Sequence, residues 1–230
     1  MCFSVEADVA VALAILPVAV ASLREVRNVR EVPFAALPLL FALHQLIEAV
    51  VWAGAEGHVS PGVQHAAAMA YLVFALPVLP TLMPLAVLLL EPRGFRLRVA
   101  PFLALGLVVS TYLGWALLTG PFSVVAHPHA VEYDPDLRHG NVWALLYILA
   151  VIGPQLLSGY RSIIAFGWVN LVGLTVVAVT YVEAFVSLWC VYAACTSALV
   201  LVHMVRRRRL SDADRLRGES RRAAWQGSAP

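Results

Sequence analysis

The chain has 230 residues, of which 61% are hydrophobic and only 13% are charged. An ordinary soluble domain carries about a quarter charged residues, so this composition excludes a soluble globular fold and predicts an integral membrane protein. All 16 basic residues are arginine. The chain therefore cannot hold a retinal cofactor through a Schiff base, because that linkage requires a lysine amine.

Seven hydrophobic stretches are long enough to cross a bilayer, which takes about 20 residues of helix. They predict an all-α fold of seven transmembrane helices, at residues 5–23, 33–54, 62–90, 99–119, 142–158, 162–180 and 182–205. The third stretch is too long for a straight span. It contains Pro77, Pro80 and Pro84, so we expect a kink or break in its second half.

Arginine placement predicts the orientation, because cytoplasmic loops are enriched in basic residues. The first, third and fifth connections and the tail carry most of the arginines: Arg24, Arg27, Arg30, Arg93, Arg96, Arg98, Arg161 and Arg206–Arg209. The other side has only Arg138, beside acidic residues. We therefore expect the N-terminus outside and the C-terminus in the cytoplasm, with a transmembrane domain at 1–205. The basic tail at 206–230 should be disordered and attract anionic lipid headgroups, whereas nucleic acid is not favoured as its partner.

The second span carries the densest polar set. His44, Glu48 and Trp52 recur every four residues and share one helix face, with Gln45 adjacent. Ionisable residues within a membrane are costly, so each is a functional hypothesis. A His and a Glu one turn apart can bind a divalent metal ion or work as an acid and base. Alternatively, they hydrogen-bond to each other and to a neighbouring helix to specify packing.

Other polar residues fall at similar depth, in the outer half of the membrane. We predict one outward-facing cavity in which Tyr112 joins His44 and Glu48 in catalysis. Ligand-binding residues would be Gln45, Trp52, Asn170 and Glu183, and the cavity could also include Glu6 and His65, although residues at helix ends often sit in water. Asp8 starts the first helix on the same side. The inner half offers mainly Gln155 and His203, and His203 should snorkel to the interface.

A metal ion at this site would have His44, Glu48, Cys2 and His65 as candidate ligands. Cys2 could equally be a nucleophile, a lipid attachment point or an ordinary terminal residue. The loop from Gly120 to Gly140 is rich in His and acidic residues, but such a set binds metal weakly without a fixed scaffold. A lid over the cavity is the more economical role for this loop.

Two stretches carry a family resemblance: the start MCFSVEAD and the second span PFAALPLLFALHQLIEAVVW. They resemble an uncharacterised family of bacterial multi-pass membrane proteins that begin MCFS and have an HQxxE pattern in the second span. The resemblance implies a seven-span protein of the bacterial inner membrane and marks Cys2, Ser4, His44, Gln45 and Glu48 as motif positions.

The seven-span shape with an intramembrane His is also similar to alkaline ceramidase-like zinc hydrolases. These have a Ser one turn before the first His ligand and an HxxxH pair in a late helix. Here Leu40 precedes His44 by one turn, and His203 is followed by Arg207.

Three functions remain open at this stage. The first is a metal-dependent or acid/base enzyme that acts on a lipid or small amphiphile. The second is a transporter or receptor that binds an ion or small polar ligand through Glu48. The third is a structural or assembly subunit in which polar groups only specify helix packing. Phosphate loops, GxSxG and HExxH motifs are absent from the sequence, which argues against soluble-type nucleotide chemistry.

Overall fold

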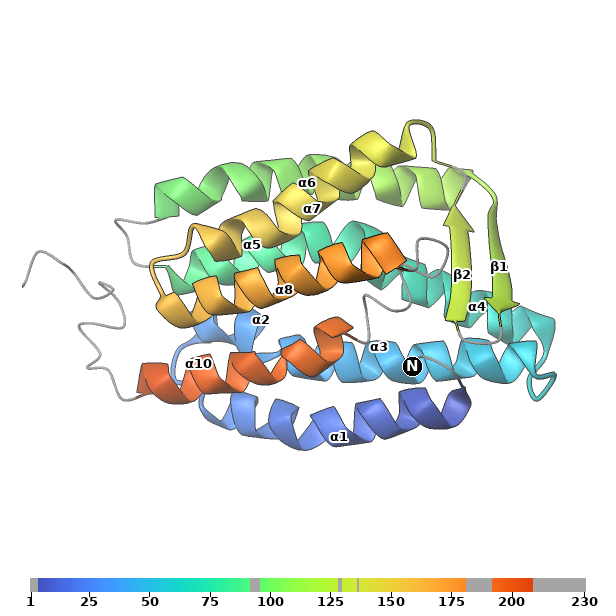
Figure 1. Ribbon diagram of the computed structural model, residues 1–230, viewed down its shortest axis with the longest axis horizontal. Coiled ribbons are helices and arrows are strands. Elements are labelled where there is room, and N and C mark those ends of the chain that lie inside the picture. The colour runs from blue at the N-terminus through green and yellow to red at the C-terminus, as the bar shows by residue number, and fades with distance from the viewer. Residues whose placement is uncertain (1–3, 92–95, 128–129, 136, 181–191, 209–230) are drawn as a thin grey trace, which may run out of the picture.

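The computed structural model describes residues 4–91, 96–127, 130–135, 137–180 and 192–208. Its helices run along the long axis of the molecule and alternate in direction to form one bundle (Figure 1). They are α1 (Val5–Arg24), α2 (Val32–Ala35), α3 (Leu37–Ala55), α4 (Pro61–Val73), α5 (Leu79–Leu90), α6 (Arg96–Thr119), α7 (Gly140–Leu156), α8 (Arg161–Thr180) and α10 (Ala198–Arg208). Short 3-10 and π turns, η1 (Val29–Glu31) and η2 (Phe74–Val78), precede α2 and α5. Residues 192–196 are also helical.

Five helical segments in the described part of the chain are long and apolar enough to cross a membrane. They are Val5–Arg24, Val29–Ala55, Pro61–Leu90, Arg96–Thr119 and Arg161–Val179, and each coincides with a predicted span. The helix Gly140–Leu156 is apolar but shorter. The predicted seventh span, 182–205, lies partly at 181–191, outside the described residues. Their length and apolar composition are consistent with the membrane protein that the composition predicts.

The third predicted span has a local irregularity near its middle, within a helix that is continuous over Pro61–Leu90, rather than a break in its second half. The helix changes to a π turn at Phe74–Val78, where the Leu79 N–H bonds the carbonyl of Phe74 five residues back. Pro80 has no N–H to continue this pattern to the carbonyl of Ala75. The Tyr147 hydroxyl of α7 donates to that carbonyl instead, at 2.7 Å. A proline-induced irregularity is thus satisfied by a neighbouring helix, as membrane helices require.

Small residues allow close helix packing at two places. α1 packs mainly against α3, and its buried residues follow a four-three spacing that includes Ala12, Ala19 and Ser22. On α6, a Cβ added to Gly106 would lie 1.9 Å from the carbonyl oxygen of Pro80. Only glycine permits that approach of α6 to α5, in keeping with the small residues found at membrane helix contacts.

The connection between α6 and α7 contains a β-hairpin that the all-α prediction missed. Strands β1 (Phe122–His127) and β2 (Ala130–Pro135) pair antiparallel, with Phe122 opposite Pro135 and His127 opposite Ala130. The hairpin lies across one end of the bundle (Figure 1). Val131 and Tyr133 of β2 are buried and Asp134 is exposed, the alternation expected of a strand with one covered face.

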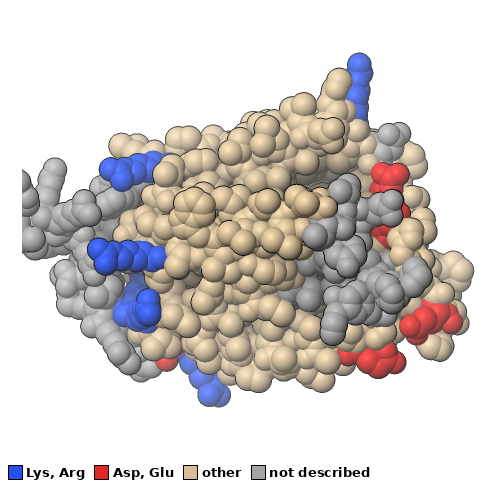
Figure 2. All heavy atoms as spheres, viewed as in Figure 1, with Lys and Arg blue, Asp and Glu red and all other residues tan. Residues whose placement is uncertain are grey.

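Charge divides the molecule into two ends. On the face shown in Figure 2, arginine side chains gather mostly at one end and acidic side chains mostly at the other. The first, which we call the arginine end, holds the C-termini of α1 and α10 and the N-terminus of α8 (Figure 1). The second, the hairpin end, holds β1, β2 and the start of α1.

Candidate functional site

The polar residues of the second predicted span lie together on buried faces of α3. His44, Gln45, Glu48 and Trp52 have exposed fractions of 1%, 0%, 0% and 6%. Asp8 of α1 is also 0% exposed and lies close enough to Glu48 for their carboxylates to interact electrostatically. These five residues form what we call the α3 site. The structure therefore adds a second carboxylate to the predicted set.

Most polar atoms of the α3 site have no hydrogen-bond partner among the described residues. These atoms are both carboxylate oxygens of Asp8, both ring nitrogens of His44, the amide oxygen and nitrogen of Gln45, and the indole nitrogen of Trp52. A buried polar group without a partner costs several kcal/mol in an apolar medium, so native proteins rarely keep one without a purpose. For His44, the described residues do not supply the hydrogen bonds that a purely packing role would need.

Aromatic rings connect the α3 site to the hairpin. The His44 ring stacks on Tyr71 of α4 with centroids 3.9 Å apart and an interplanar angle of 14°. Tyr71 in turn stacks on Tyr133 of β2, at 4.5 Å and 13°. A second stacked pair, His65 of α4 with Phe122 of β1 at 4.7 Å, anchors the other strand. These stacked pairs attach the hairpin to α4, and the Tyr71 ring connects Tyr133 to His44.

The described residues do not support the predicted metal ligands. They contain no group of three or more His, Cys, Asp or Glu side chains that could hold a metal ion. His65 is exposed and stacks on Phe122 rather than joining His44. Cys2 and Glu183 lie outside the described residues. In the hairpin, the His127 Nε2 and Glu132 Oε2 atoms form a hydrogen bond of 2.6 Å between the strands, which is a pair rather than a cluster.

Tyr112, predicted to act beside His44, lies elsewhere. It is half-buried on α6, its ring stacks on Trp143 of α7 at 3.7 Å, and its hydroxyl donates to the backbone carbonyl of Arg138 at 2.9 Å. With its neighbours it lines a shallow surface groove of about 480 Å³, made by Leu107, Val108, Thr111, Tyr112, Trp115 and Trp143. The prediction used the depth of Tyr112 alone, because α6 is apolar on nearly every side and offers no periodic signal for its buried face.

Asn170 and Glu6 also lie apart from the α3 site. The Asn170 amide nitrogen donates to the side-chain oxygen of Gln155 at 3.3 Å, and its oxygen accepts from the Thr196 hydroxyl at 3.3 Å. Asn170 therefore links α7, α8 and residues 192–196 as a packing contact. Glu6 is exposed at the start of α1. Two residues further along, Asp8 continues the four-three stripe of buried positions on α1, a signal that could have distinguished the two.

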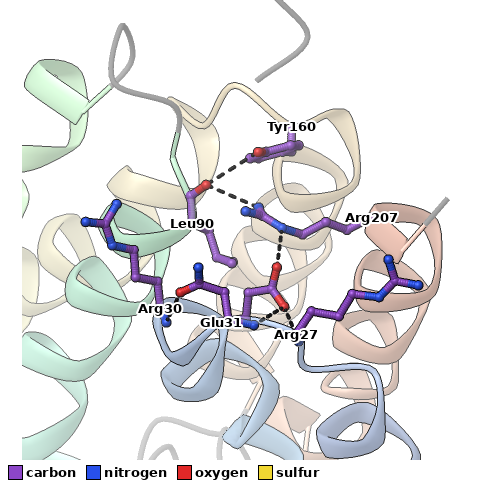
Figure 3. Close-up of polar contacts among 7 residues, drawn as sticks. Arg27, Arg30, Glu31, Leu90, Tyr160 and Arg207 are labelled. Carbon is purple, nitrogen blue, oxygen red and sulfur yellow. Dashed lines mark hydrogen bonds and ion pairs between the residues drawn. The ribbon is translucent and has the colours of Figure 1, made fainter. Parts of the chain in front are cut away.

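A second buried polar cluster lies at the arginine end (Figure 3). The Arg207 Nε donates to Glu31 Oε1 at 3.1 Å, and another Arg207 nitrogen donates to the carbonyl of Leu90 at 3.1 Å. The Tyr160 hydroxyl donates to the same carbonyl at 3.4 Å, and the guanidinium lies 5.2 Å from the Tyr160 ring centroid. The backbone N–H of Arg27 donates to Glu31 Oε2 at 2.9 Å. This Arg207 network joins η1, α5, the α7–α8 turn and α10.

Glu91 extends the polar contacts at this end. Its buried carboxylate accepts from the Ser158 hydroxyl and, at 3.0 Å, from the Gly159 N–H. Burial raises the pKa of the Glu91 carboxyl, while these hydrogen bonds and the charges of Arg207 and Arg96 oppose the rise. The α7–α8 turn is thereby tied to the end of α5.

Two predictions at the arginine end were wrong. His203 does not snorkel: it is 2% exposed, lies edge-on to Phe34 and Tyr160, and bonds the Ser162 hydroxyl at 2.7 Å. Arg207, placed in the solvated tail, is buried in α10, which continues to Arg208. Residues 209–230 lie outside the described part. The four consecutive arginines carry no sequence signal that singles out Arg207.

Comparison with known proteins agrees with the first resemblance. A family profile described as "Family of unknown function (DUF6629)" matches residues 1–216. The chain belongs to this family. The match covers all the described helices, the α3 site and the Arg207 network. No curated protein and no solved structure matches the chain.

The resemblance to alkaline ceramidase-like hydrolases is not supported. His44 contacts Tyr71 and Phe74, whereas His203 contacts Phe34, which precedes His44 by ten residues. At 1.5 Å per helical residue, this places the two histidines about 15 Å apart along the bundle. They cannot ligate one zinc ion, whose ligand bonds are about 2 Å long.

Proposed function

We propose that this protein is a seven-span membrane protein that binds a small polar ligand in the α3 site. The N-terminus and hairpin end would face outward and the arginine end the cytoplasm. The separation of acidic and basic side chains between the two ends supports this orientation (Figure 2). The seventh span would comprise residues 182–205.

One observation carries the binding proposal. Asp8, His44 and Gln45 are almost completely buried, yet their side-chain polar atoms have no hydrogen-bond partner among the described residues. In a membrane protein such groups are expensive and mark ligand or ion pathways. A polar ligand that supplies the missing partners accounts for all three side chains at once.

The burial of the site favours a small ligand over a lipid substrate. A lipid headgroup would have to reach His44, which is enclosed by Tyr71 and Phe74 and lies one ring below Tyr133. A small ion or metabolite can be held in such a closed site, as ligand pockets bury most of their ligand's surface. We therefore favour a transporter or receptor over an enzyme acting on lipid.

The test compares two histidines that both stack on aromatic rings. In His44→Phe the stack on Tyr71 is kept and the ring nitrogens are lost, while His65→Phe makes the same change at the exposed pair with Phe122. Thermal unfolding of purified protein would be followed across a panel of ions, amino acids, amines and organic acids.

A ligand at 100 times its Kd stabilises the folded protein by about 2.7 kcal/mol, or roughly 5–10 °C in Tm for a chain of this size. We expect this shift in wild type and His65→Phe and its loss in His44→Phe. Equal shifts in both variants would refute the α3 site as the binding site. No shift in wild type with any compound would refute the binding function.

A further inference from the structure

A groove on the surface of α6 and α7 lies apart from the α3 site. The two helices pack against each other at the edge of the bundle (Figure 1). The groove has a volume of about 480 Å³ and is lined by Leu107, Val108, Thr111, Tyr112, Trp115 and Trp143. We infer that it binds the acyl chain of a phospholipid whose phosphate lies at Arg138. This inference requires the membrane placement proposed above, but it does not depend on a ligand in the α3 site.

The hydroxyl groups that line the groove are already hydrogen-bonded to the backbone. The Thr111 hydroxyl donates to the carbonyl of Leu107 at 2.8 Å, and the Tyr112 hydroxyl donates to the carbonyl of Arg138 at 2.9 Å. The rest of the lining is aliphatic or aromatic. A hydrocarbon chain can therefore fill the groove by van der Waals packing without leaving these hydroxyls unpaired. An acyl chain is the hydrocarbon that a membrane supplies.

The aromatic wall of the groove is fixed before any chain binds. The Tyr112 ring stacks on Trp143 with centroids 3.7 Å apart and an interplanar angle of 9°, while its hydroxyl is held by the Arg138 carbonyl. Trp115 lies on the other side of Tyr112, with ring centroids 6.3 Å apart. A preformed surface loses little side-chain entropy when it binds a ligand, so it retains a chain better than a mobile surface does.

The depth of the groove matches the outer leaflet. Trp115 lies about one turn and Leu107 about three turns before the end of α6 at Thr119. The groove therefore extends over about 12 Å of α6, from near the hairpin end toward the middle of the span. Trp and Tyr side chains are enriched at the membrane–water interface, where the glycerol and phosphate of a phospholipid also lie.

Arg138 supplies a positive charge at the outer end of the groove. Its side chain is exposed, and its backbone carbonyl is bonded to the Tyr112 hydroxyl in the groove wall. It is the only arginine that the predicted topology places on this side of the membrane. The adjacent α7 begins at Gly140, so the positive end of its dipole lies on the same side. A guanidinium binds phosphate oxygens through charge-assisted hydrogen bonds, so a lipid phosphate complements this charge.

The first experiment measures phospholipid retained on the purified protein by native mass spectrometry. Val108→Trp fills the groove, and Val172→Trp makes the same change on α8 at a valine with the same exposed fraction, 58%. We expect retained phospholipid on wild type and Val172→Trp, and roughly tenfold weaker retention on Val108→Trp. Leu107→Trp, at a residue that is 51% exposed, replaces Val108→Trp if that variant does not fold.

The second experiment tests the phosphate. Phosphatidylethanolamine and diacylglycerol with the same acyl chains are titrated into delipidated protein, since only the first carries a phosphate. Arg138→Gln should weaken the apparent affinity for phosphatidylethanolamine about fivefold and leave that for diacylglycerol unchanged, because the lost contact is an exposed one. Arg161→Gln, which removes an exposed arginine at the opposite end, should change neither affinity.

The outcomes separate this inference from the proposed function. Equal retention on Val108→Trp and Val172→Trp, or no phospholipid on wild type, would overturn the groove as a lipid site. An unchanged affinity of Arg138→Gln for phosphatidylethanolamine, or an equal loss for diacylglycerol, would overturn the phosphate at Arg138. His44→Phe should retain phospholipid as wild type does, so a failure of the α3 site leaves this result unaffected.

Discussion

Replacing Arg207 by Met should destabilise the protein more than any other single change at the arginine end. Arg207 is 5% exposed and donates to both Glu31 and the carbonyl of Leu90, each at 3.1 Å. The substitution removes the guanidinium that pairs with the buried Glu31 carboxylate, and breaking such a buried pair costs about 3–5 kcal/mol. Since native proteins are stable by only about 5–15 kcal/mol, this loss is a large part of the total.

The adjacent Arg206 supplies the matched control, because it is exposed on the same helix. Reversible unfolding in mixed detergent micelles would give the free energy of each variant. Arg206→Met should lie within about 0.5 kcal/mol of wild type. Adding Glu31→Gln to Arg207→Met should recover part of the loss, because a neutral amide tolerates burial better than an unpaired carboxylate. If Arg207→Met and Arg206→Met differ by less than about 1 kcal/mol, the Arg207 network does not stabilise the bundle.

Three further predictions concern the lid, the helix packing and the pH response. Tyr133→Ala removes the hairpin ring that stacks on Tyr71, so the rate at which diethylpyrocarbonate modifies His44 should rise roughly fivefold or more, as loss of an aromatic pair allows. The control Asp134→Asn, on the exposed face of the hairpin, should leave this rate unchanged. Equal rates in the two variants would exclude a lid role for the hairpin. Gly106→Ala should cost about 1–3 kcal/mol through overpacking, whereas Gly62→Ala, where a Cβ meets nothing within 4 Å, should not destabilise the protein. Burial raises the pKa of the Glu91 carboxyl above 4.5, so the folded state holds this proton more tightly than the unfolded state. The free energy of unfolding of wild type should therefore fall as pH rises from about 4.5 through the raised pKa. Glu91→Gln should flatten this pH dependence, and an unchanged pH dependence would contradict the raised pKa of Glu91.

The helices and the irregular third span could be predicted because their signals are local. A run of about 20 apolar residues requires a helix in a membrane whatever its neighbours are. Pro77 and Pro80 interrupt hydrogen bonding within their own helix, so an irregularity in this span follows from the chain itself. The common face of His44, Glu48 and Trp52 likewise follows from helical periodicity alone.

The hairpin at Phe122–Pro135 was missed because a strand needs a partner and a surface to cover. A two-stranded hairpin is marginal by itself, and this one is anchored by Tyr133 on Tyr71 and by Phe122 on His65. Neither contact is encoded in the spacing of the loop residues. From its composition the segment was predicted to be a loop that acts as a lid, and strand pairing was not predicted.

The sequence by itself predicted apolar helices long enough to cross a membrane, the positions of most of them, and a polar set of His44, Gln45 and Glu48 on one helix, whose side chains are buried in the structure. Only the tertiary structure decided which polar groups meet. Asp8 joins Glu48 because α1 packs on α3, Tyr112 is excluded because its face of α6 points outward, and Arg207 is buried because Glu31 lies opposite. Helical periodicity assigns a residue to a face of its own helix, but the neighbour of that face depends on how all the helices pack.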